Sequence, residues 1–567
     1  MRLSGWTLIF PSQKSHSDRL LGILLSLTAA TFYTMLTATG RTSEVPVISW
    51  QTDTNPQREE QIMLFREWLV RNGHIQKDKD GKPVLYTQEE ADALNAHYGV
   101  KPGEPHSVKA GDKKPNGNVV AETASNQSTL IQAVSGMAGD IVDTAEVLGY
   151  QQMGVGVPLT EDANKNGYGL NTTYPGMAGL LVGMDGEQYA YPCNGSSATV
   201  WINMDTLNRF GVKEIPEDWT PEDFERIGKE YVMRANEGLQ RQEYFFTQSL
   251  DSGAGVSLLT NIVRSKGHDL YNETLTRCVA DNDIFKKYIK LFYKWTYEDR
   301  LVPNAADVAS MSTESGYGGA DFSNFISGKY AMVVTGRYCL IRFREVQDEK
   351  NKALVKEGKE PNFRINFATR LPPQYEFKNF IFGTRAAMLY RGSGQQELAR
   401  LFIQFLASRE YNRYIVEKAD GLPPNPRLVM EELKAIPKAR PNEGNVNLQE
   451  VEWAMTIGIP GNFSPFVKSG SPNWLQSSIN QYFNNRMTLD EAVRNIETRY
   501  NMEIEISKKA NPRMREAWEK DWAIQQKIDE YKKAGRKIPA EWIKNPFYLK
   551  YYREKGMLRE STPGEKK

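Results

Sequence analysis

Cysteine is scarce in this sequence. Only three occur in 567 residues, Cys193, Cys278 and Cys339, so at most one disulfide can form and one thiol is left over. No CxxC spacing and no cysteine–histidine cluster is present, so the sequence indicates no metal site. We therefore expect a fold that does not depend on disulfides, and cysteine usage leaves the cellular compartment open.

An excess of charge of either sign is also missing. The 71 lysines and arginines balance 70 aspartates and glutamates, for a formal net charge of +1. Because no basic surplus exists, nucleic acid is not an expected partner. The motifs GxxxxGK[ST], HExxH and GxSxG are absent, and no GxGxxG follows a strand-like run. The sequence thus indicates neither ATP hydrolysis by a phosphate-binding loop nor a cofactor.

Long apolar runs are rare, and the one at the N-terminus stands out. Arg2, Lys14 and Arg19 precede residues 20–40, which are uncharged and mostly apolar. This length is close to what spans a bilayer as a helix. A basic flank followed by an apolar stretch predicts that residues 1–41 are a secretory signal or membrane anchor, with a buried soluble helix as the alternative. No cysteine follows, which excludes a lipoprotein anchor; the rest of the chain is expected to be extracytoplasmic.

Strand-like and helix-like patterns alternate along the rest of the chain. Residues 45–50 predict a first strand, and Asn55 with Pro56 predicts the start of a helix after it. Thr220 is expected to cap a second helix, and residues 488–491 form a capping-box pattern before another. Such alternation is typical of α/β layers. At 567 residues the chain should form two or more lobes.

Two segments contain residue patterns that resemble those of metal-binding sites. Residues 74–118 are polar and rich in glycine and proline, and we expect an exposed insertion there. Three of the five histidines lie in it: His74, His97 and His106. Solvated loop histidines are the favoured interpretation of these three. Residues 162–173 resemble an EF-hand loop, but Thr173 stands where a bidentate glutamate is required, so a polar turn is expected instead. No metal is predicted.

Five segments, taken in order, resemble the extracytoplasmic solute-binding proteins of carbohydrate ABC transporters, the maltose-binding-protein-like family. Each motif is weak alone, and the five in order span roughly residues 44 to 505. They are QAVSGMAGDIVD, GEQYAYPCNGSSATVWINMDTLNRFGVKEIPEDWTPEDFERIGKE, FISGKYAMVVTGRYCL, RLFIQFLASREYNRYIVEKADGLPPNP and PNWLQSSINQYFNNRMTLDEAVRNIETRY.

The resemblance implies an α/β, two-lobed type II periplasmic-binding-protein fold with crossover strands between the lobes. An N-terminal signal or anchor helix and a charged C-terminal helical tail, which contains Trp518 and Trp522, would be additions. The expected divisions are 42–192 for lobe 1, 193–380 for lobe 2, 381–415 for a return to lobe 1, 416–506 for a return to lobe 2 with the closing helices, and 507–567 for the tail.

The resemblance also implies binding residues at the ends of strands. Residues 331–334 are an apolar run that predicts a buried strand, followed by Gly336, Arg337 and Tyr338. In the family this segment reaches the cleft, so Tyr338 would stack on a sugar, Arg337 would donate hydrogen bonds and Gly336 would allow close approach of the backbone. Trp474 would be a second stacking residue, or alternatively a core residue of its lobe.

Further binding residues are implied at three other cleft-facing loops. Trp50 and Asp53 follow the first strand, where carboxylates commonly hold sugar hydroxyls. Glu146 lies after a later strand. Asn194 and Ser196 lie in a segment that resembles the first crossover between the lobes.

The implied function is the capture of a carbohydrate and its delivery to an ABC-transporter permease by hinge closure. We expect the carbohydrate to be an oligosaccharide. No catalysis is needed, and a monomer is expected. Two alternatives stay open. The protein is a membrane-anchored sugar sensor or scaffold acting through its tail, or an enzyme on the same fold with Cys193 or Cys339 as nucleophile, although no histidine lies near either in the sequence.

Overall fold

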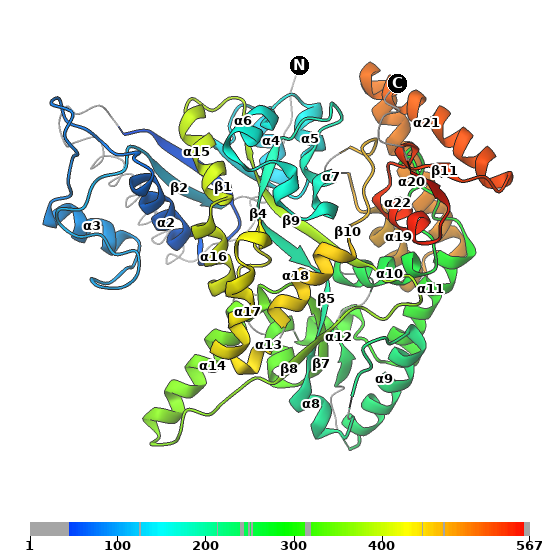
Figure 1. Cartoon of the computed structure of the whole chain (residues 1–567). Coiled ribbons are helices and arrows are strands. Elements are labelled where there is room, and N and C mark those ends of the chain that lie inside the picture. Colours follow the sequence, from blue (N-terminus) through cyan, green and yellow to red (C-terminus); the bar gives the residue numbers. More distant parts are fainter. Residues whose placement is uncertain are drawn as a thin grey trace, which may run out of the picture.

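The computed structural model describes residues 45–560 apart from 124–125, 213, 239–242, 248–249, 251–252, 312–318, 445 and 469–470 (Figure 1). The expected signal or anchor segment at 20–40 lies outside these residues. Among the described residues, no helix is both long enough and apolar enough to cross a membrane.

Lobe 1 is built on a six-stranded mixed sheet with the order β10-β9-β3-β1-β2, in which β4 pairs with β9. The strands are β1 (Val47–Thr52), β2 (Asn118–Thr123), β3 (Ile141–Thr144), β4 (Ala190–Ser197), β9 (Phe380–Leu389) and β10 (Gly458–Pro460). Strand β1 runs parallel to β2 and β3, whereas β9 runs antiparallel to β3 and β4. The carboxyl ends of β1 and β3 therefore lie at one edge, where the loops that follow them meet.

Helices of lobe 1 cover this sheet with apolar faces. The aromatic rings of Trp50, Phe65 and Phe402 pack together in its core, with centroids 5.0 to 5.2 Å apart. The helices are α2 (Arg58–Arg71), α3 (Gln88–His97), α4 (Asn126–Val134), α5 (Leu148–Gln152), α6 (Thr160–Asn166), α7 (Ala178–Leu181), α15 (Gln396–Leu406), α16 (Arg409–Lys418), α17 (Met430–Ala439) and α18 (Val446–Thr456). The β-loop-α start expected after residue 50 is confirmed, but the helix begins at Arg58, two residues later than Asn55 and Pro56 predicted, because the Asn55 side chain accepts the Gln57 N–H in a turn before the helix.

Lobe 2 is built on a four-stranded sheet with the order β6-β7-β5-β8. The strands are β5 (Thr199–Asn203), β6 (Tyr244–Phe246), β7 (Tyr330–Thr335) and β8 (Phe367–Arg370). The helices are α8 (Met204–Arg209), α9 (Pro221–Ala235), α10 (Gly253–Ser265), α11 (Asp283–Tyr293), α12 (Ala305–Met311), α13 (Gly319–Ser327), α14 (Cys339–Lys356), α19 (Trp474–Phe483) and α20 (Leu489–Ala510). The predicted caps at Thr220 and Thr488 are confirmed, because both side chains accept a backbone N–H of the first turn.

Three connections join the two sheets. The chain passes from β4 to β5 at Ala198, returns between β8 and β9 through 371–379, and passes again after β10 through 461–473. The first and third passages lie later than the boundaries expected at 193 and 416, whereas the second lies just before the boundary expected at 381. Helices α17 and α18 and strand β10 stay with lobe 1, because their apolar side chains pack on β9. A helical pattern in the sequence does not say which sheet the helix will cover.

The expected insertion carries more regular structure than its composition indicated. Helix α3 forms within it, started by a capping box at Thr87. The His74 ring stacks on Trp68, and His106 Nδ1 lies 2.9 Å from Glu67 Oε1. These contacts hold the insertion against α2, so the sequence-based picture of solvated loop histidines was wrong for these two residues.

The EF-hand-like segment also differs from expectation. Residues 160–166 form α6 rather than a turn, and Gly167 ends the helix at a φ of 75°, where glycine is favoured. Within the described residues, no group of histidine, cysteine, aspartate and glutamate side chains is arranged to hold a metal ion.

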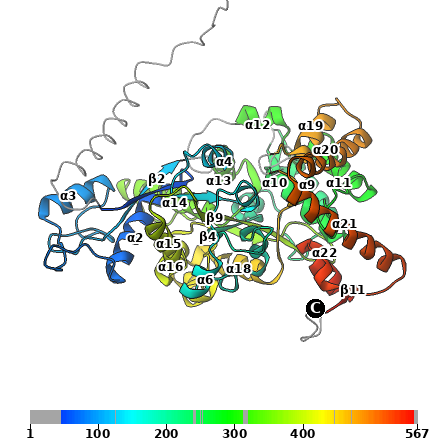
Figure 2. The same ribbon diagram turned by 90° about the horizontal axis from the view of Figure 1, so that it is seen from above.

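The C-terminal tail is helical, as predicted, and adds a small sheet. It consists of α21 (Pro512–Lys533), β11 (Ile538–Pro539), α22 (Pro546–Glu554) and β12 (Leu558–Arg559), with β11 parallel to β12. The tail and the insertion lie at opposite ends of the molecule, with α3 at one end and α21 and α22 at the other (Figure 2).

Candidate functional site

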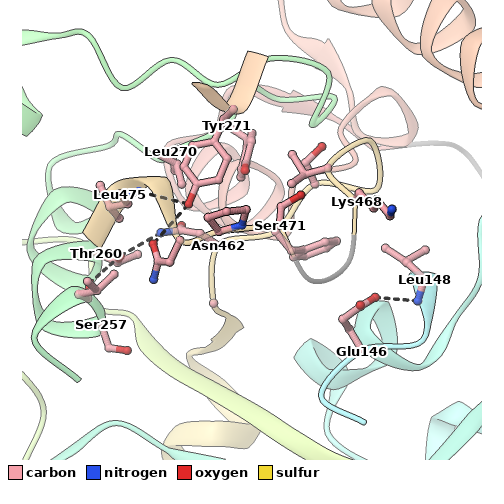
Figure 3. A pocket seen from close by; sticks show the side chains of 18 of the residues that line it. Glu146, Leu148, Ser257, Thr260, Leu270, Tyr271, Asn462, Lys468, Ser471 and Leu475 are labelled. Carbon is pink, nitrogen blue, oxygen red and sulfur yellow. Dashed lines mark hydrogen bonds between the residues drawn. The ribbon is translucent and has the colours of Figure 1, made fainter. Parts of the chain in front are cut away.

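A pocket of about 330 Å³ has walls from both lobes (Figure 3). Lobe 1 contributes the loop after β3 and the start of α5. Lobe 2 contributes α10, the loop that follows it and the start of α19, while the connection after β10 lies between them. The residues that carry the argument are Glu146, Tyr271, Asn462, Lys468 and Asn473.

Glu146 is the charged residue that lobe 1 places in the pocket. Its backbone N–H donates to Thr144 Oγ1 at the end of β3, and its carboxylate Oε2 accepts the N–H of Leu148 at 2.7 Å. These bonds fix the turn between β3 and α5 and leave Oε1 without a partner among the described residues. The structure thus brings this predicted residue to the pocket wall.

The lobe 2 wall is a set of polar side chains already held in place. Asn462 Nδ2 donates to Thr260 Oγ1 at 3.0 Å, and Tyr500 OH donates to Asn473 Oδ1 at 3.4 Å. The Tyr271 ring packs edge-on against Tyr500, with centroids 5.9 Å apart. Aromatic rings therefore stand beside amide and hydroxyl groups, an arrangement that can hold an apolar face and hydrogen-bond its polar edge.

Lys468 adds a positive charge on the lobe 2 side. It lies in the connection after β10 and is exposed, and it forms no ion pair within the described part of the chain. Sequence reasoning missed Lys468, Tyr271 and Asn462. Tyr271 and Asn462 lie in irregular segments that no motif marks, and only the fold brings them to the same pocket.

A second group of charges lies at the carboxyl ends of β1 and β3, in lobe 1. Arg58 binds Asp53 at 2.8 Å and Asp420 at 2.5 Å, while Arg385 binds Asp143 and lies 3.8 Å from both Asp53 and Asp420. Burial alone would raise the pKa of the Asp420 carboxyl, but Arg58 and Arg385 lower it to about 2. We call these five residues the arginine–aspartate cluster.

Three predicted site residues meet at this cluster. Asp53 belongs to it and is 50% exposed, so its carboxylate can still reach a ligand. Asn194 donates to the Asp420 side chain at 3.1 Å and is buried. Trp50 is fully buried, donates to Asp143 through Nε1 and lies beneath both guanidinium groups. The structure therefore gives Trp50 and Asn194 packing partners within lobe 1 in place of a ligand. Ser196 is exposed on β4.

Arg337 does not face the pocket. It is 0% exposed, and its guanidinium donates to the backbone carbonyls of Ile415, Val416 and Gly421 and to Asn447 Oδ1. The first two carbonyls belong to the last turn of α16, which a cation stabilises. The expected donation to a ligand is thus not found. The partners lie 78 or more residues away in the sequence, so no local pattern predicts these hydrogen bonds.

The neighbours of Arg337 support the crossover between the lobes. The predicted buried strand at 331–334 is confirmed as part of β7. A Cβ at Gly336 would lie 2.9 Å from the Tyr338 ring and 3.2 Å from Ser197 N, so glycine permits close approach of the chain to itself. Tyr338 is half-buried and packs near Phe322, with centroids 6.2 Å apart.

Trp474 lies beside the pocket as the first residue of α19. Its neighbours Asn473 and Leu475 line the pocket, whereas its own ring packs on the core of lobe 2. The Arg499 guanidinium lies 5.1 Å from the ring centroid. This arrangement matches the core alternative for Trp474 and leaves a stacking role for the ring as a prediction.

A buried carboxyl at the crossover makes stability depend on pH. Glu450 on α18 is fully buried and accepts the Ser197 hydroxyl at 2.5 Å. Burial raises its pKa from 4.5 to about 7, although Ser197 and Arg337 oppose the rise. The folded state therefore binds more protons than the unfolded state between these values. Stability should fall by about 3 kcal/mol as the pH rises through this window.

Glu450→Gln should abolish this dependence. We expect the variant to match the wild type near pH 5 and to exceed its free energy of unfolding near pH 8, measured by urea titration at both values. Glu452→Gln, which changes an exposed residue on the same helix, is the control. A wild-type-to-variant difference that stays constant with pH would show that the Glu450 pKa is not raised.

Comparison with known proteins agrees with this architecture. The family model described as bacterial extracellular solute-binding protein matches residues 108–413, more than half of the chain. The chain belongs to this family. Its members are extracellular, so the protein functions outside the cytoplasm. A comparison with curated protein sequences gave no match.

Solved structures share the fold at low sequence identity. An ABC substrate-binding protein of Listeria monocytogenes in complex with cycloalternan is 17% identical with a TM-score of 0.58, covering 81% of this chain and 98% of that one. An ABC-transporter solute-binding protein of Thermotoga lettingae bound to α-D-tagatose is 14% identical with a TM-score of 0.57, covering 81% and 100%. The maltose/maltodextrin-binding domain of Bdellovibrio bacteriovorus bound to maltotriose is 14% identical with a TM-score of 0.53, and the match covers 81% of this chain and 100% of that one.

Proposed function

We propose that this solute-binding protein captures a carbohydrate, an oligosaccharide by preference, in the pocket between its lobes and delivers it to an ABC-transporter permease. The observation that carries the proposal is a pocket that brings the Glu146 carboxylate of lobe 1 together with polar and aromatic side chains of lobe 2. Similar folds hold cycloalternan, α-D-tagatose and maltotriose, which are all carbohydrates.

The mechanism is hinge closure. A saccharide that hydrogen-bonds Glu146 on lobe 1 and contacts Tyr271 on lobe 2 interacts with both walls only when the lobes approach each other. Such a ligand shifts the population towards the closed state, and the permease recognises that state. Tyr271 would stack on an apolar sugar face, and Lys468 would donate to hydroxyls.

Other predicted residues keep a role as a proposed extension of the site. Asp53, which follows β1, and Ser196, on β4, are exposed, and Tyr338 is half-buried near the crossover. We assign Trp50, Asn194, Gly336 and Arg337 to support of the site, because their contacts are with the protein itself.

We also propose that the protein is not catalytic. Burial raises the pKa of the Cys193 and Cys339 thiols, which opposes formation of a thiolate nucleophile at neutral pH. Neither thiol has a histidine partner among the described residues. We further propose that the protein acts as a monomer, and that residues 20–40 export the chain or anchor it to the cytoplasmic membrane.

A saccharide panel tests the site. Residues 42–567 are screened by thermal shift against mono- and oligosaccharides, and we expect at least one to raise the melting temperature by mass action. Glu146→Gln should weaken the affinity for that saccharide by about 10- to 100-fold, the value of one hydrogen bond to a charged group. Lys468→Met should also weaken it.

Glu161→Gln is the matched control, because this exposed glutamate lies on lobe 1 at the start of α6 and does not line the pocket. If Glu146→Gln and Lys468→Met both bind the saccharide with the affinity of the wild type, this pocket is not the binding site. A panel in which peptides bind and saccharides do not would overturn the carbohydrate assignment.

A further inference from the structure

The C-terminal tail packs on the loop that forms part of the pocket wall. Residues 269–278 follow α10 and present Leu270 and Tyr271 to the pocket. On its other side the same loop carries Glu273, which is buried. Among the described residues, every donor to the Glu273 carboxylate comes from the tail.

Glu273 is bound from two tail helices. Lys532 Nζ donates to Oε1 at 2.6 Å and Gln525 Nε2 donates to Oε2 at 2.8 Å, both from α21, while Tyr552 OH of α22 donates to Oε1 at 2.6 Å. Burial alone would raise the pKa of Glu273, but Lys532 and these donors lower it. The carboxylate therefore stays ionised and holds the loop to the tail.

The backbone of the loop is bound as well. Asn545, the N-cap of α22, donates through Nδ2 to Asp269 Oδ2 at 2.9 Å and to the carbonyl of Tyr271 at 3.1 Å. Trp518 Nε1 of α21 donates to the carbonyl of Thr276 at 2.9 Å. The position of the Tyr271 ring in the pocket is thus fixed from behind by the tail.

Helix α22 also touches one of the connections between the lobes and the end of lobe 1 that leads into another. The rings of Phe547 and Tyr551 pack edge-on against Phe377, which lies between β8 and β9, at 5.7 and 5.1 Å. Lys550 donates to the carbonyl of Thr456, just before β10. Ile459 of β10 lies in the same apolar cluster as α22.

We propose that residues 512–560 are a brace that positions the pocket wall at Leu270 and Tyr271 and stiffens the connection between β8 and β9 together with strand β10, which leads into the last connection between the lobes. Its relevance to saccharide capture rests on the proposed function. The brace itself is a property of the chain without ligand. The aromatic residues of α22 pack on other parts of the same chain. They are therefore not available to a partner protein, which disfavours the alternative in which the tail binds one.

Paired lysine variants of the full chain test the brace by hydrogen exchange without ligand. Lys532→Met removes the cation from Glu273, whereas Lys533→Met changes an exposed neighbour on the same helix. We expect amides at 270–278 to exchange about tenfold faster in Lys532→Met than in the wild type, and to be unchanged in Lys533→Met. Equal exchange at 270–278 in the two variants, or faster exchange confined to the tail, would overturn the positioning.

A second pair tests the contacts of α22. Lys550→Met is expected to speed exchange several-fold at 456–459 and 371–379, whereas Arg553→Met, on the same helix, which removes an exposed ion pair with Glu560, is not. Unchanged exchange in both segments would overturn that part of the brace. Neither result depends on a sugar. If the saccharide panel fails while these exchange results hold, the proposed function falls and the brace stands.

Discussion

Asp420→Ala is expected to lower the free energy of unfolding by about 3 to 5 kcal/mol at pH 7, because it removes the buried carboxylate that Arg58 binds and leaves Arg58 and Arg385 with too little negative charge around them. Asp420 is buried and accepts hydrogen bonds from Arg58, Gln61 and Asn55. Arg385 lies 3.8 Å away. Urea titration followed by tryptophan fluorescence measures the loss.

The pH dependence of this loss has a definite sign. The folded-state pKa of Asp420 is lowered from 3.8 to about 2, so its stabilisation is present above pH 3.8 and is lost as the pH falls through 2. The difference between wild type and Asp420→Ala should therefore shrink in this acidic window.

Asp53→Ala is the matched control, since Asp53 pairs with the same two arginines but is half exposed. We expect it to change stability by at most ~1 kcal/mol. Equal losses in Asp420→Ala and Asp53→Ala would contradict the claim that the buried carboxylate holds the cluster together.

Arg337→Met is the second change with a large expected effect. It removes the donors to three backbone carbonyls and to Asn447, all of them buried, and should lower the free energy of unfolding by about 3 to 5 kcal/mol. Methionine fills a similar volume, so the loss reports the hydrogen bonds more than a cavity. The same urea titration measures it.

Arg337 also joins the two lobes, because it follows β7 of lobe 2 and binds the end of α16 in lobe 1. Arg342→Met is the control, because Arg342 lies in the first turn of α14 and pairs only with the exposed Glu345 among the described residues; it should stay within about 0.5 kcal/mol of the wild type. An Arg337→Met protein as stable as this control would contradict the assignment of Arg337 to structural support.

Much of the fold could be predicted from local patterns. The first strand and its helix, the caps at Thr220 and Thr488, and the buried strand ending at Thr335 follow from apolar spacing and capping residues that act within a few positions. The order of five motifs then indicated the family. These signals involve neighbouring residues, so they can be recognised in a single sequence.

The site was harder to predict because its contacts are long-range. Glu146 follows a strand end and was predicted to face the cleft; it lines the pocket, and its role in binding stays a prediction. Arg337 also follows a strand end, yet its donors bind carbonyls near residue 415. The sequence shows that a strand stops, but it does not show whether the next side chain meets solvent or another helix. The role of the tail was invisible for the same reason.

The central claim is that a saccharide closes the two lobes over the pocket. Small-angle X-ray scattering of residues 42–567, with and without each saccharide of the panel at saturating concentration, tests it most directly. We predict that the saccharide that raises the melting temperature also reduces the radius of gyration, and that Glu146→Gln needs a higher concentration to do so. A saccharide panel that leaves both quantities unchanged, or a bound saccharide that leaves the radius of gyration unchanged, would contradict the account.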